Sequence, residues 1–285
     1  MKRARPGKWL LRALLRRPYT DETGRKGWFE WFSRAPSHLA HRVTLTIAGW
    51  PRTARPLRIA LLSDLHTGSY AGDLDRLAAI VAEAAAHKPD LVLHGGDFVN
   101  MQLCGGGRVP PRVVAAILAH LDAPLGCFAV LGNHDYTYGS EDVAAALESQ
   151  GIVVLSDTRR TLRFEGHDID LIGLPDAHDL RPAGKDLLAA LPSGRATIVL
   201  AHDPFWFAHV PPGPHLTLAG HTHGGQIRFP VLGVLRNASR APMRWTHGHV
   251  LEAGRHLYVT AGLGTSGIPL RVGVPPEYAV IYVSG

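Results

Sequence analysis

The chain has 285 residues, of which 46% are hydrophobic, and this is the composition of an ordinary globular protein. The length suffices for one large layered domain, or for a domain with a small extension. The two cysteines, Cys104 and Cys127, have no metal-binding or redox spacing. Their pattern excludes a disulfide scaffold and fits a reducing compartment.

The net charge of +6 is concentrated at the front of the chain. Residues 1–60 contain 14 Lys or Arg and 3 Asp or Glu, a net +11, whereas the other residues contain 16 and 21, a net −5. A basic front section on a mildly acidic body indicates an anionic surface bound by the N-terminus. It argues against a nucleic-acid groove along the body.

Residues 2–17 interleave seven basic side chains with leucines and a tryptophan. On a helix, Lys8, Arg12 and Arg16 form one charged stripe, with leucines on the other face. This pattern is typical of a helix that lies in a membrane interface, and its uncharged runs are far shorter than the roughly 20 apolar residues of a span. A solvated tail, or a helix docked on the protein's own body, is the alternative.

Four aromatic residues within 27–32 are typical of side chains at lipid headgroup depth, and equally of an aromatic cluster that closes the domain. We therefore expect residues 1–41 to form a membrane-interface segment. The globular domain is expected to occupy residues 42–285. It should start with an edge strand near residue 42, where hydrophobic and polar residues alternate.

Five apolar runs in the remaining chain predict buried strands: residues 57–62, 91–94, 127–131, 196–201 and 216–219. Helices are predicted between some of them, at 73–87, 111–121 and 140–150. The strand, helix, strand order at the front predicts parallel pairing with a right-handed crossover.

The later part of the chain contains further strand patterns. Residues 153–155, 161–164 and 168–173 are predicted to belong to a second sheet, and residues 256–260 and 278–283 predict two C-terminal strands. Ser140 is expected to cap the helix that it begins, and Gly151 to close it.

Polar side chains of metal-ligand type follow the predicted strands, and glycines occur in most of these motifs. One histidine alone is weak evidence because the chain has 17, but the repeated placement is hard to obtain by chance. A mixture of imidazole, carboxylate and amide suits Mn²⁺, Fe or Zn²⁺, and is too rich in nitrogen for Mg²⁺ or Ca²⁺. The side chains are Asp64, His66, Asp97, Asn133, His134, His202, His221 and His223.

These residues fall in five motifs that resemble the blocks of calcineurin-like metallophosphoesterases. The motifs are Ser-Asp-Leu-His at 63–66, Gly-Gly-Asp at 95–97, Gly-Asn-His-Asp at 132–135, His202, and Gly-His-Thr-His at 220–223. The resemblance implies an α/β fold, a four-layer α/β/β/α sandwich, with a dinuclear metal site at the carboxyl ends of the central strands.

The resemblance also implies a role for each matching residue. Asp64, His66 and His223 would hold one divalent metal ion, and Asn133, His202 and His221 the other, with Asp97 between the two ions. His134 would touch the phosphate and the leaving group, with Asp135 as its orienting partner. His94 departs from the family pattern, because an apolar or hydroxyl side chain is expected before the two glycines.

The ending of the chain is similar to that of a membrane-associated bacterial branch of the family. The similarity lies in Gly-Leu-Gly-Thr-Ser-Gly at 262–267 and the proline-rich segment after it. It implies that Thr265 and Ser266 approach the substrate and that Arg271 pairs with a substrate phosphate in bidentate fashion. An arginine that only closes the loop is the alternative.

The sequence therefore predicts a phosphoesterase with a two-metal mechanism, with Mn²⁺ favoured over Fe or Zn²⁺. The expected substrate is a phosphodiester or pyrophosphate on a lipid, such as UDP-2,3-diacylglucosamine of lipid A biosynthesis. The expected place is the cytoplasm, peripherally on the inner membrane, with no nucleic-acid partner. The alternatives are a soluble nucleotide or nucleic-acid phosphodiesterase and, less favoured, a scaffold that has lost its metals.

Overall fold

The first of two six-stranded sheets contains both the first and the last strand that the structure describes. The structure is a computed structural model, and it describes residues 34–101, 107–177, 181–234 and 236–285. The strand order is β1 (Leu39–Thr46), β14 (Glu277–Ser284), β2 (Leu57–Leu62), β3 (Leu91–His94), β4 (Cys127–Ala129) and β5 (Val153–Val154).

Within this sheet the C-terminal strand β14 lies between β1 and β2. It runs parallel to β1 and antiparallel to β2. Strands β2, β3, β4 and β5 are parallel to one another, with Ile59 beside Leu91 in the β2–β3 register. The prediction of parallel pairing between the two early strands is confirmed.

The second sheet is formed by later segments of the chain. Its order is β12 (Gly248–Glu252), β13 (Arg255–Val259), β9 (His215–Ala219), β8 (Thr197–Ala201), β7 (His167–Leu174) and β6 (Thr158–Phe164). Strands β7, β8, β9 and β13 are parallel, and the two outer strands pair antiparallel with their neighbours.

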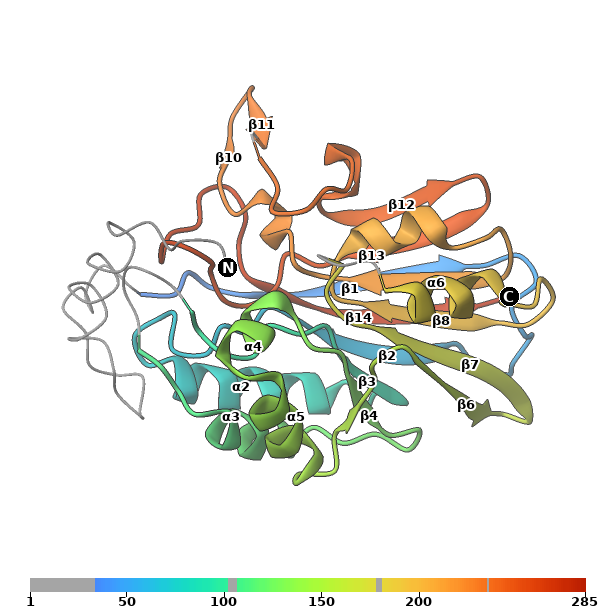
Figure 1. The fold of residues 1–285 in the computed structure, drawn as a ribbon, viewed down its shortest axis with the longest axis horizontal. Helices are drawn as coiled ribbons and strands as arrows, with labels where there is room; N and C mark the ends of the chain where they lie inside the picture. The colour runs from blue at the N-terminus through green and yellow to red at the C-terminus, as the bar shows by residue number, and fades with distance from the viewer. Residues whose placement is uncertain (1–33, 102–106, 178–180, 235) are drawn as a thin grey trace.

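Helices cover the outer faces of the two sheets (Figure 1). Below the first sheet lie α2 (Asp73–Ala86), α3 (Pro111–Leu118), α4 (Asn133–Tyr138) and α5 (Ser140–Glu148). The second sheet is covered by α6 (Pro182–Ala189) and by the 3-10 helices η2 (Pro204–His209) and η4 (Met243–Trp245). The short η3 (His223–Gly225) follows β9.

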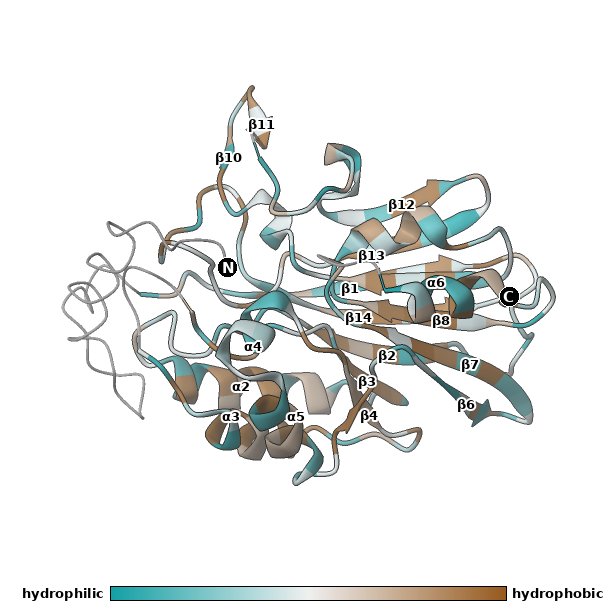
Figure 2. Cartoon of the chain, viewed as in Figure 1, coloured by the Kyte–Doolittle hydropathy of each residue, from teal (hydrophilic) through white to brown (hydrophobic). Residues whose placement is uncertain are grey.

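The hydrophobic core has three parts, one for each contact between layers. Alternation along β2 shows how the sequence produces them, because Ile59 and Leu61 face the second sheet while Ala60 and Leu62 face the helices. A third cluster joins β8 and β9 to η2 through side chains such as Trp206. The chain thus folds as the predicted four-layer α/β/β/α sandwich, with brown hydrophobic strands at its centre (Figure 2).

Three local predictions are corrected by the structure. Residues 153–154 form β5, which pairs with β4 of the first sheet and not with the second sheet. Ser140 is the first residue of α5, and Gly139 occupies the capping position without a side-chain hydrogen bond. Strand β1 begins at Leu39, slightly earlier than expected, and it is the predicted edge strand.

The predicted amphipathic segment at 2–17 and the aromatic residues of 27–32 lie outside the described residues, as does Cys104. Among the residues that the structure does describe, no helix has the length and hydrophobicity needed to cross a membrane.

Candidate metal centre

The predicted ligands follow the carboxyl ends of parallel strands in both sheets. Asp64 and His66 follow β2, and Asp97 follows β3. His202 follows β8 in the second sheet, and His221 follows β9. Because parallel strands end at the same edge of a sheet, the fold brings these loops together there.

Five of the ligand positions have a left-handed backbone. The φ angles are 51° at Asp64, 39° at His66, 57° at Asp97, 67° at His221 and 53° at His223. Positive φ is uncommon in residues other than glycine, and such conformations persist where the surroundings fix them, often at functional sites. The backbone at these positions is therefore set by the site and not by local preference.

The first donor cluster consists of Asp64, His66 and His223, whose ligand atoms lie within 4.8 Å of one another. The Nε2 atoms of His66 and His223 are 3.1 Å apart, and Nε2 of His223 is 3.7 Å from Oδ1 of Asp64. Two ligands of one divalent ion are about 3.0–3.5 Å apart when each lies about 2.1 Å from it. The spacing therefore fits a metal ion.

The second donor cluster consists of Asp97, His202 and His221, again within 4.8 Å, together with Asn133. Nε2 of His202 is 3.0 Å from Nδ1 of His221 and 3.3 Å from Oδ1 of Asn133. Two imidazole nitrogens, one amide oxygen and one carboxylate thus converge on one point. This donor set also fits a divalent metal ion.

Asp97 joins the two clusters. Its Oδ2 lies 3.5 Å from Nε2 of His66 and 3.6 Å from Nε2 of His202. The other oxygen, Oδ1, accepts the backbone N–H of His134 at 2.8 Å. The carboxylate is buried, so it has no access to bulk water that would satisfy its remaining lone pairs. Asp97 would therefore contribute to both ligand sets if each cluster held a cation.

The charges of the centre match this geometry. Burial lowers the pKa of His66 and of His223 well below the usual value, which keeps these imidazoles neutral, as metal ligation requires. Burial alone would raise the pKa of Asp97, but the imidazoles of His202 and His134 more than offset it and hold the carboxyl ionised.

The pKa of His202 indicates that the surrounding carboxylates stabilise a positive charge at this point. Burial would lower its pKa, yet the carboxylates of Asp97 and Asp64 raise it to about 9. A cation is therefore favoured between these carboxylates. His202 Nδ1 lies 2.7 Å from the carbonyl oxygen of Gly95, which fixes the ring with Nε2 turned to the centre.

Comparison with known proteins identifies the family. The profile of the calcineurin-like phosphoesterases matches residues 57–225, more than half of the chain. The chain belongs to this family. It is a hydrolase of phosphoric esters, and its family depends on divalent metal ions.

Two bacterial relatives extend the match beyond the motifs. The chain is 30% identical over 264 residues to phosphodiesterase YaeI of Escherichia coli, covering 90% of this chain and 88% of the relative. It is 30% identical over 226 residues to metallophosphoesterase YkuE of Bacillus subtilis, covering 78% and 77%. The similarity therefore includes most of the domain.

His134 lies at this phosphoesterase centre outside the two donor clusters, although one of its ring nitrogens lies within 4.8 Å of ligand atoms of His66 and Asp97. Its ring meets the His66 ring edge-on at 4.6 Å, and its Nε2 lies 3.2 Å from Oγ of Ser266. Its Nδ1 is buried and has no hydrogen-bond partner among the described residues. A substrate oxygen would satisfy that nitrogen.

Asp135 does not orient His134 as expected. Its Oδ2 accepts the backbone N–H groups of Asp97 at 2.8 Å and Gly132 at 3.0 Å, and Oδ1 accepts that of Phe98 at 2.9 Å. The carboxylate therefore ties the loop after β3 to the loop after β4. It positions Asp97 and Asn133, and the hydrogen bond recorded for the His134 ring goes to Ser266 instead.

The hydrogen bonds of Arg271 favour the loop-closing alternative over phosphate binding. The guanidinium donates to the carbonyl oxygen of Gly264 from Nε at 2.9 Å and from Nη2 at 2.6 Å, and to that of Ala261 at 2.7 Å. Burial lowers its pKa, although it remains a strong cation. Arg271 thus braces the glycine loop that carries Thr265 and Ser266.

His94, the departure from the family pattern, takes no part in the centre. It is fully buried, neither ring nitrogen has a partner among the described residues, and its ring lies 6.0 Å from that of Phe98. Burial lowers its pKa to about 4, so it is a neutral side chain of the helix-facing layer.

Sequence reasoning missed several groups that support the ligands. Ser63 donates from Oγ to Oδ2 of Asp64 at 2.7 Å, and Asp203 Oδ2 lies 3.8 Å from Nε2 of His221. Asp203 follows His202 directly, so a carboxylate beside a ligand histidine was a signal in the sequence. Asp176 completes a third group with Asp203 and His221, but its loop position carries no sequence signal.

A pocket of about 340 Å³ opens beside the second donor cluster. Asn133 and His221 of that cluster line it, together with Asp176, Asp203 and Arg240. The guanidinium of Arg240 lies 5.0 Å over the Phe205 ring, which holds it at the pocket. The pocket gives a substrate access to the centre and presents one cation to it.

Proposed function

We propose that this chain hydrolyses a phosphodiester or pyrophosphate bond with two divalent metal ions, of which Mn²⁺ is favoured. The observation that carries the proposal is Asp97, one buried carboxylate within 3.6 Å of an imidazole from each donor cluster. Asp64, His66 and His223 would hold one ion. Asn133, His202 and His221 would hold the other.

When bound, such a metal pair supplies an activated water and neutralises charge on the phosphate oxygens. The residues of the chain hold the proposed metal ligands in place. Asp135 fixes the two loops that carry Asp97 and Asn133, and the Gly95 carbonyl fixes the His202 ring. Because these contacts exist before substrate arrives, little reorganisation is needed when charge develops.

His134 is proposed to act on the substrate. With Nε2 beside Ser266 Oγ and Nδ1 unpartnered, its ring can donate to a phosphate oxygen or to the departing oxygen. Ser266 sets the ring orientation, and Thr265 places the glycine loop through its backbone N–H, which donates to Ser69 Oγ at 3.3 Å.

The substrate is proposed to be lipid-linked, for instance UDP-2,3-diacylglucosamine, and to be met at the cytoplasmic face of the inner membrane. The support is the basic, tryptophan-containing composition of residues 1–41 and the name phosphodiesterase carried by the Escherichia coli relative. An acylated diester remains in the bilayer, so its hydrolase must reach the headgroup layer.

A substrate panel tests the proposal. Purified full chain with added Mn²⁺ is assayed on UDP-2,3-diacylglucosamine, a glycerophospholipid, a cyclic nucleotide, single-stranded DNA and bis(4-nitrophenyl) phosphate. The proposal expects hydrolysis of the nitrophenyl diester and the highest kcat/KM on a lipid-linked substrate. No hydrolysis by a metal-loaded chain would refute the enzyme assignment, whereas preference for the nucleotide or DNA would favour the soluble alternative.

A further inference from the structure

The hairpin formed by β10 (Arg228–Phe229) and β11 (Gly233–Val234) projects from the body of the molecule (Figure 1). Its tip is hydrophobic and open to solvent. Val231 is fully exposed at 105%, Leu232 is 69% exposed and Phe229 is 44% exposed. A water-soluble surface gains nothing from three adjacent exposed side chains of this kind, so a partner surface is indicated.

A second apolar segment lies beside the base of the hairpin. The Arg228 N–H donates to the carbonyl oxygen of Val272 at 2.8 Å, and that of Val272 donates to Gln226 at 3.1 Å. The loop that leads to Val272 exposes Ile268 at 44% and Leu270 at 50%. The exposed apolar side chains of the hairpin tip and of this neighbouring loop are together called the docking patch: Phe229, Val231, Leu232, Ile268 and Leu270.

The chain segment that contains the hairpin carries charged side chains of one sign. The sequence contains no Asp or Glu between Asp203 and Glu252, and four arginines fall in that interval, at 228, 236, 240 and 244. All four are exposed. The Arg228 side chain has no ion-pair partner among the described residues, whereas Arg244 pairs with Glu252. An apolar tip with Arg228 at its base matches an anionic lipid surface.

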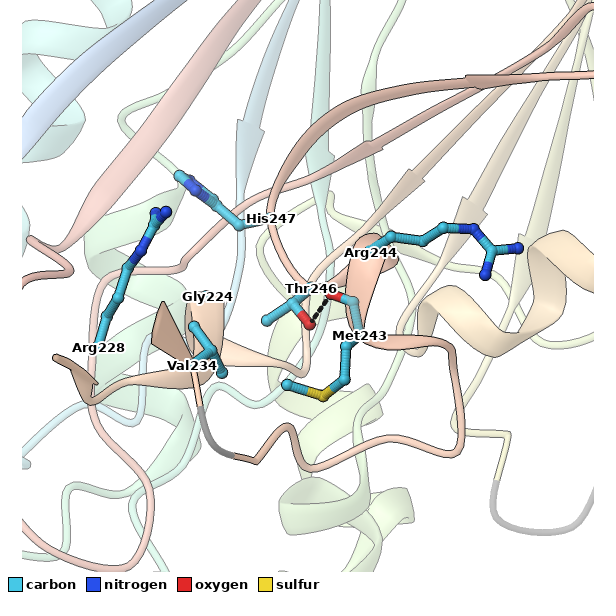
Figure 3. A pocket seen from close by; sticks show the side chains of 7 residues that line it. All are labelled: Gly224, Arg228, Val234, Met243, Arg244, Thr246 and His247. Carbon is cyan, nitrogen blue, oxygen red and sulfur yellow. Dashed lines mark hydrogen bonds between the residues drawn. The ribbon is translucent and has the colours of Figure 1, made fainter. Parts of the chain in front are cut away.

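A pocket of about 370 Å³ lies under the hairpin and offers a place for a headgroup. Figure 3 shows Arg228 and His247 on one side of it and Arg244 on the other, with Met243 and Val234 between. The Arg228 guanidinium, with the apolar Val234 and Met243 in the same lining, suits a phosphate whose ester group continues into a hydrophobic layer, whereas Arg244 is paired with Glu252.

The docking patch is joined to the metal centre by short connections. The hairpin starts a few residues after the ligand His223, and the intervening Gln226 accepts the Ser266 N–H at 2.8 Å and donates to its carbonyl at 3.0 Å. Ser266 in turn contacts the His134 ring. The base of the hairpin is therefore linked to His134 of the centre through Gln226 and Ser266.

We propose that the docking patch inserts into the headgroup layer of an anionic bilayer, with Arg228 at the lipid phosphates. This contact is separate from residues 1–41, and it orients the centre toward the membrane. The membrane contact depends on the proposed function only in its biological role, which is to bring a lipid-linked phosphoester to the centre. The insertion itself requires no catalysis.

Hydrogen exchange on the full chain tests the contact locally. Exchange is compared with and without vesicles of phosphatidylethanolamine and phosphatidylglycerol, and with phosphatidylcholine vesicles. The proposal expects slower exchange in peptides covering 227–234 and 266–272 with the anionic vesicles. Peptides from β12 should not change. Because the readout is local, binding by the N-terminal segment cannot imitate it, and unchanged exchange in the hairpin would overturn the proposal.

Variants test which side chains carry the contact. Val231→Ser with Leu232→Ser removes two exposed apolar groups that pack against little, and vesicle partition is expected to fall roughly tenfold. The matched control is Leu251→Ser, 58% exposed on β12, which should bind as the wild type does. Equal partition of all three proteins would contradict the docking patch.

The charge is tested in the same way. Arg228→Gln is expected to lower partition onto anionic vesicles roughly fivefold and to leave phosphatidylcholine binding unchanged. Its control is Arg163→Gln on β6, whose side chain is 71% exposed. Hydrolysis of bis(4-nitrophenyl) phosphate by the wild type is measured in parallel. Vesicle protection without hydrolysis would defeat the proposed function alone, and hydrolysis without protection would defeat the docking patch alone.

Discussion

His134 is proposed to act on the substrate and not to hold a metal ion. Its Nδ1 is buried and unpartnered among the described residues, and its Nε2 meets Ser266. Replacement by alanine leaves every proposed ligand in place. We expect His134→Ala to keep its metal content and to lose kcat by roughly 10²–10³-fold, the usual contribution of a positioned proton donor.

Elemental analysis beside steady-state kinetics checks this expectation. The control is Thr137→Ala in the same helix, whose hydroxyl only donates to the Asn133 carbonyl at 2.8 Å, and which should stay within about threefold of wild type. A metal-replete His134→Ala protein with normal kcat would remove His134 from the mechanism. Loss of metal in that variant would make it a ligand instead.

Asp90 provides a stability prediction away from the centre. Two nitrogens of Arg55 donate to the Asp90 carboxylate at 2.6 and 2.8 Å, and the backbone N–H of Arg58 donates to it at 2.9 Å. Burial alone would raise the pKa of Asp90, but these donors lower it below 3.8. A carboxyl group whose pKa is lower in the folded state than in the unfolded state stabilises the fold at pH values above its unfolded-state pKa. That stabilisation is lost as the pH falls through its folded-state pKa.

We therefore expect Asp90→Asn to lower the free energy of unfolding at pH 7 by roughly 1–3 kcal/mol. The difference from wild type should shrink as pH falls below 3.8. Urea unfolding across pH measures it. The exposed Asp168, paired with Arg163 at 3.2 Å, is the control, and Asp168→Asn should change stability by less than about 1 kcal/mol. A pH-independent loss at Asp90 would point to packing and not to charge.

At the scale of elements, the strand-end loops are packed so closely that glycine is required. A Cβ on Gly132 would lie 2.2 Å from Oδ1 of Asp97 and 2.5 Å from Cε1 of His202, although its φ of −98° suits any residue. We expect Gly132→Ala to displace the shared carboxylate without deleting a donor. Metal affinity should fall at least tenfold while the fold persists.

Calorimetric titration with Mn²⁺ and far-UV circular dichroism test this expectation. Gly194→Ala is the matched control, because a Cβ there meets nothing within 4 Å and its φ is not in the left-handed region. It should bind Mn²⁺ as the wild type does. Equal affinity in both variants would show that the loop after β4 can move aside.

The strong periodic elements could be predicted from the sequence, and the weak ones could not. Continuous apolar runs such as 57–62 and 91–94 located β2 and β3, and glycine-flanked polar residues located the ligands after them. Strand β12 was missed because an edge strand with mixed residues has no clear period. The hairpin was missed because two-residue strands give no pattern at all.

Other differences depended on long-range contacts. The sheet that accepts β5 is decided by its pairing with Phe128 and Ala129, which no local signal reveals. Asp135 was placed beside His134 because the two are neighbours in sequence, but its partners lie in the loop at 97–99 and at Gly132. Backbone N–H groups as partners leave no side-chain motif to recognise.

At the scale of the whole molecule, the centre joins the two sheets. Asp64, His66, Asp97 and Asn133 follow strands of the first sheet, and the ligand histidines His202, His221 and His223 follow strands of the second. Cations held between them would therefore bind the folded state only, since the donors are far apart in an unfolded chain. Metal binding and folding are then linked.

We therefore expect chelation to lower the melting temperature of the metal-loaded protein. A ligand at 100 times its Kd stabilises the folded state by about 2.7 kcal/mol, and for a domain of this size about 1 kcal/mol shifts Tm by roughly 2 °C. A fall of about 5 °C or more is expected on addition of EDTA. Mn²⁺ in excess should restore Tm, and Mg²⁺ should not, because nitrogen donors bind it poorly. Gly132→Ala should show a smaller chelator response than wild type, since its shared carboxylate is displaced, and an identical Tm with and without EDTA in the wild type would mean that the clusters hold no metal.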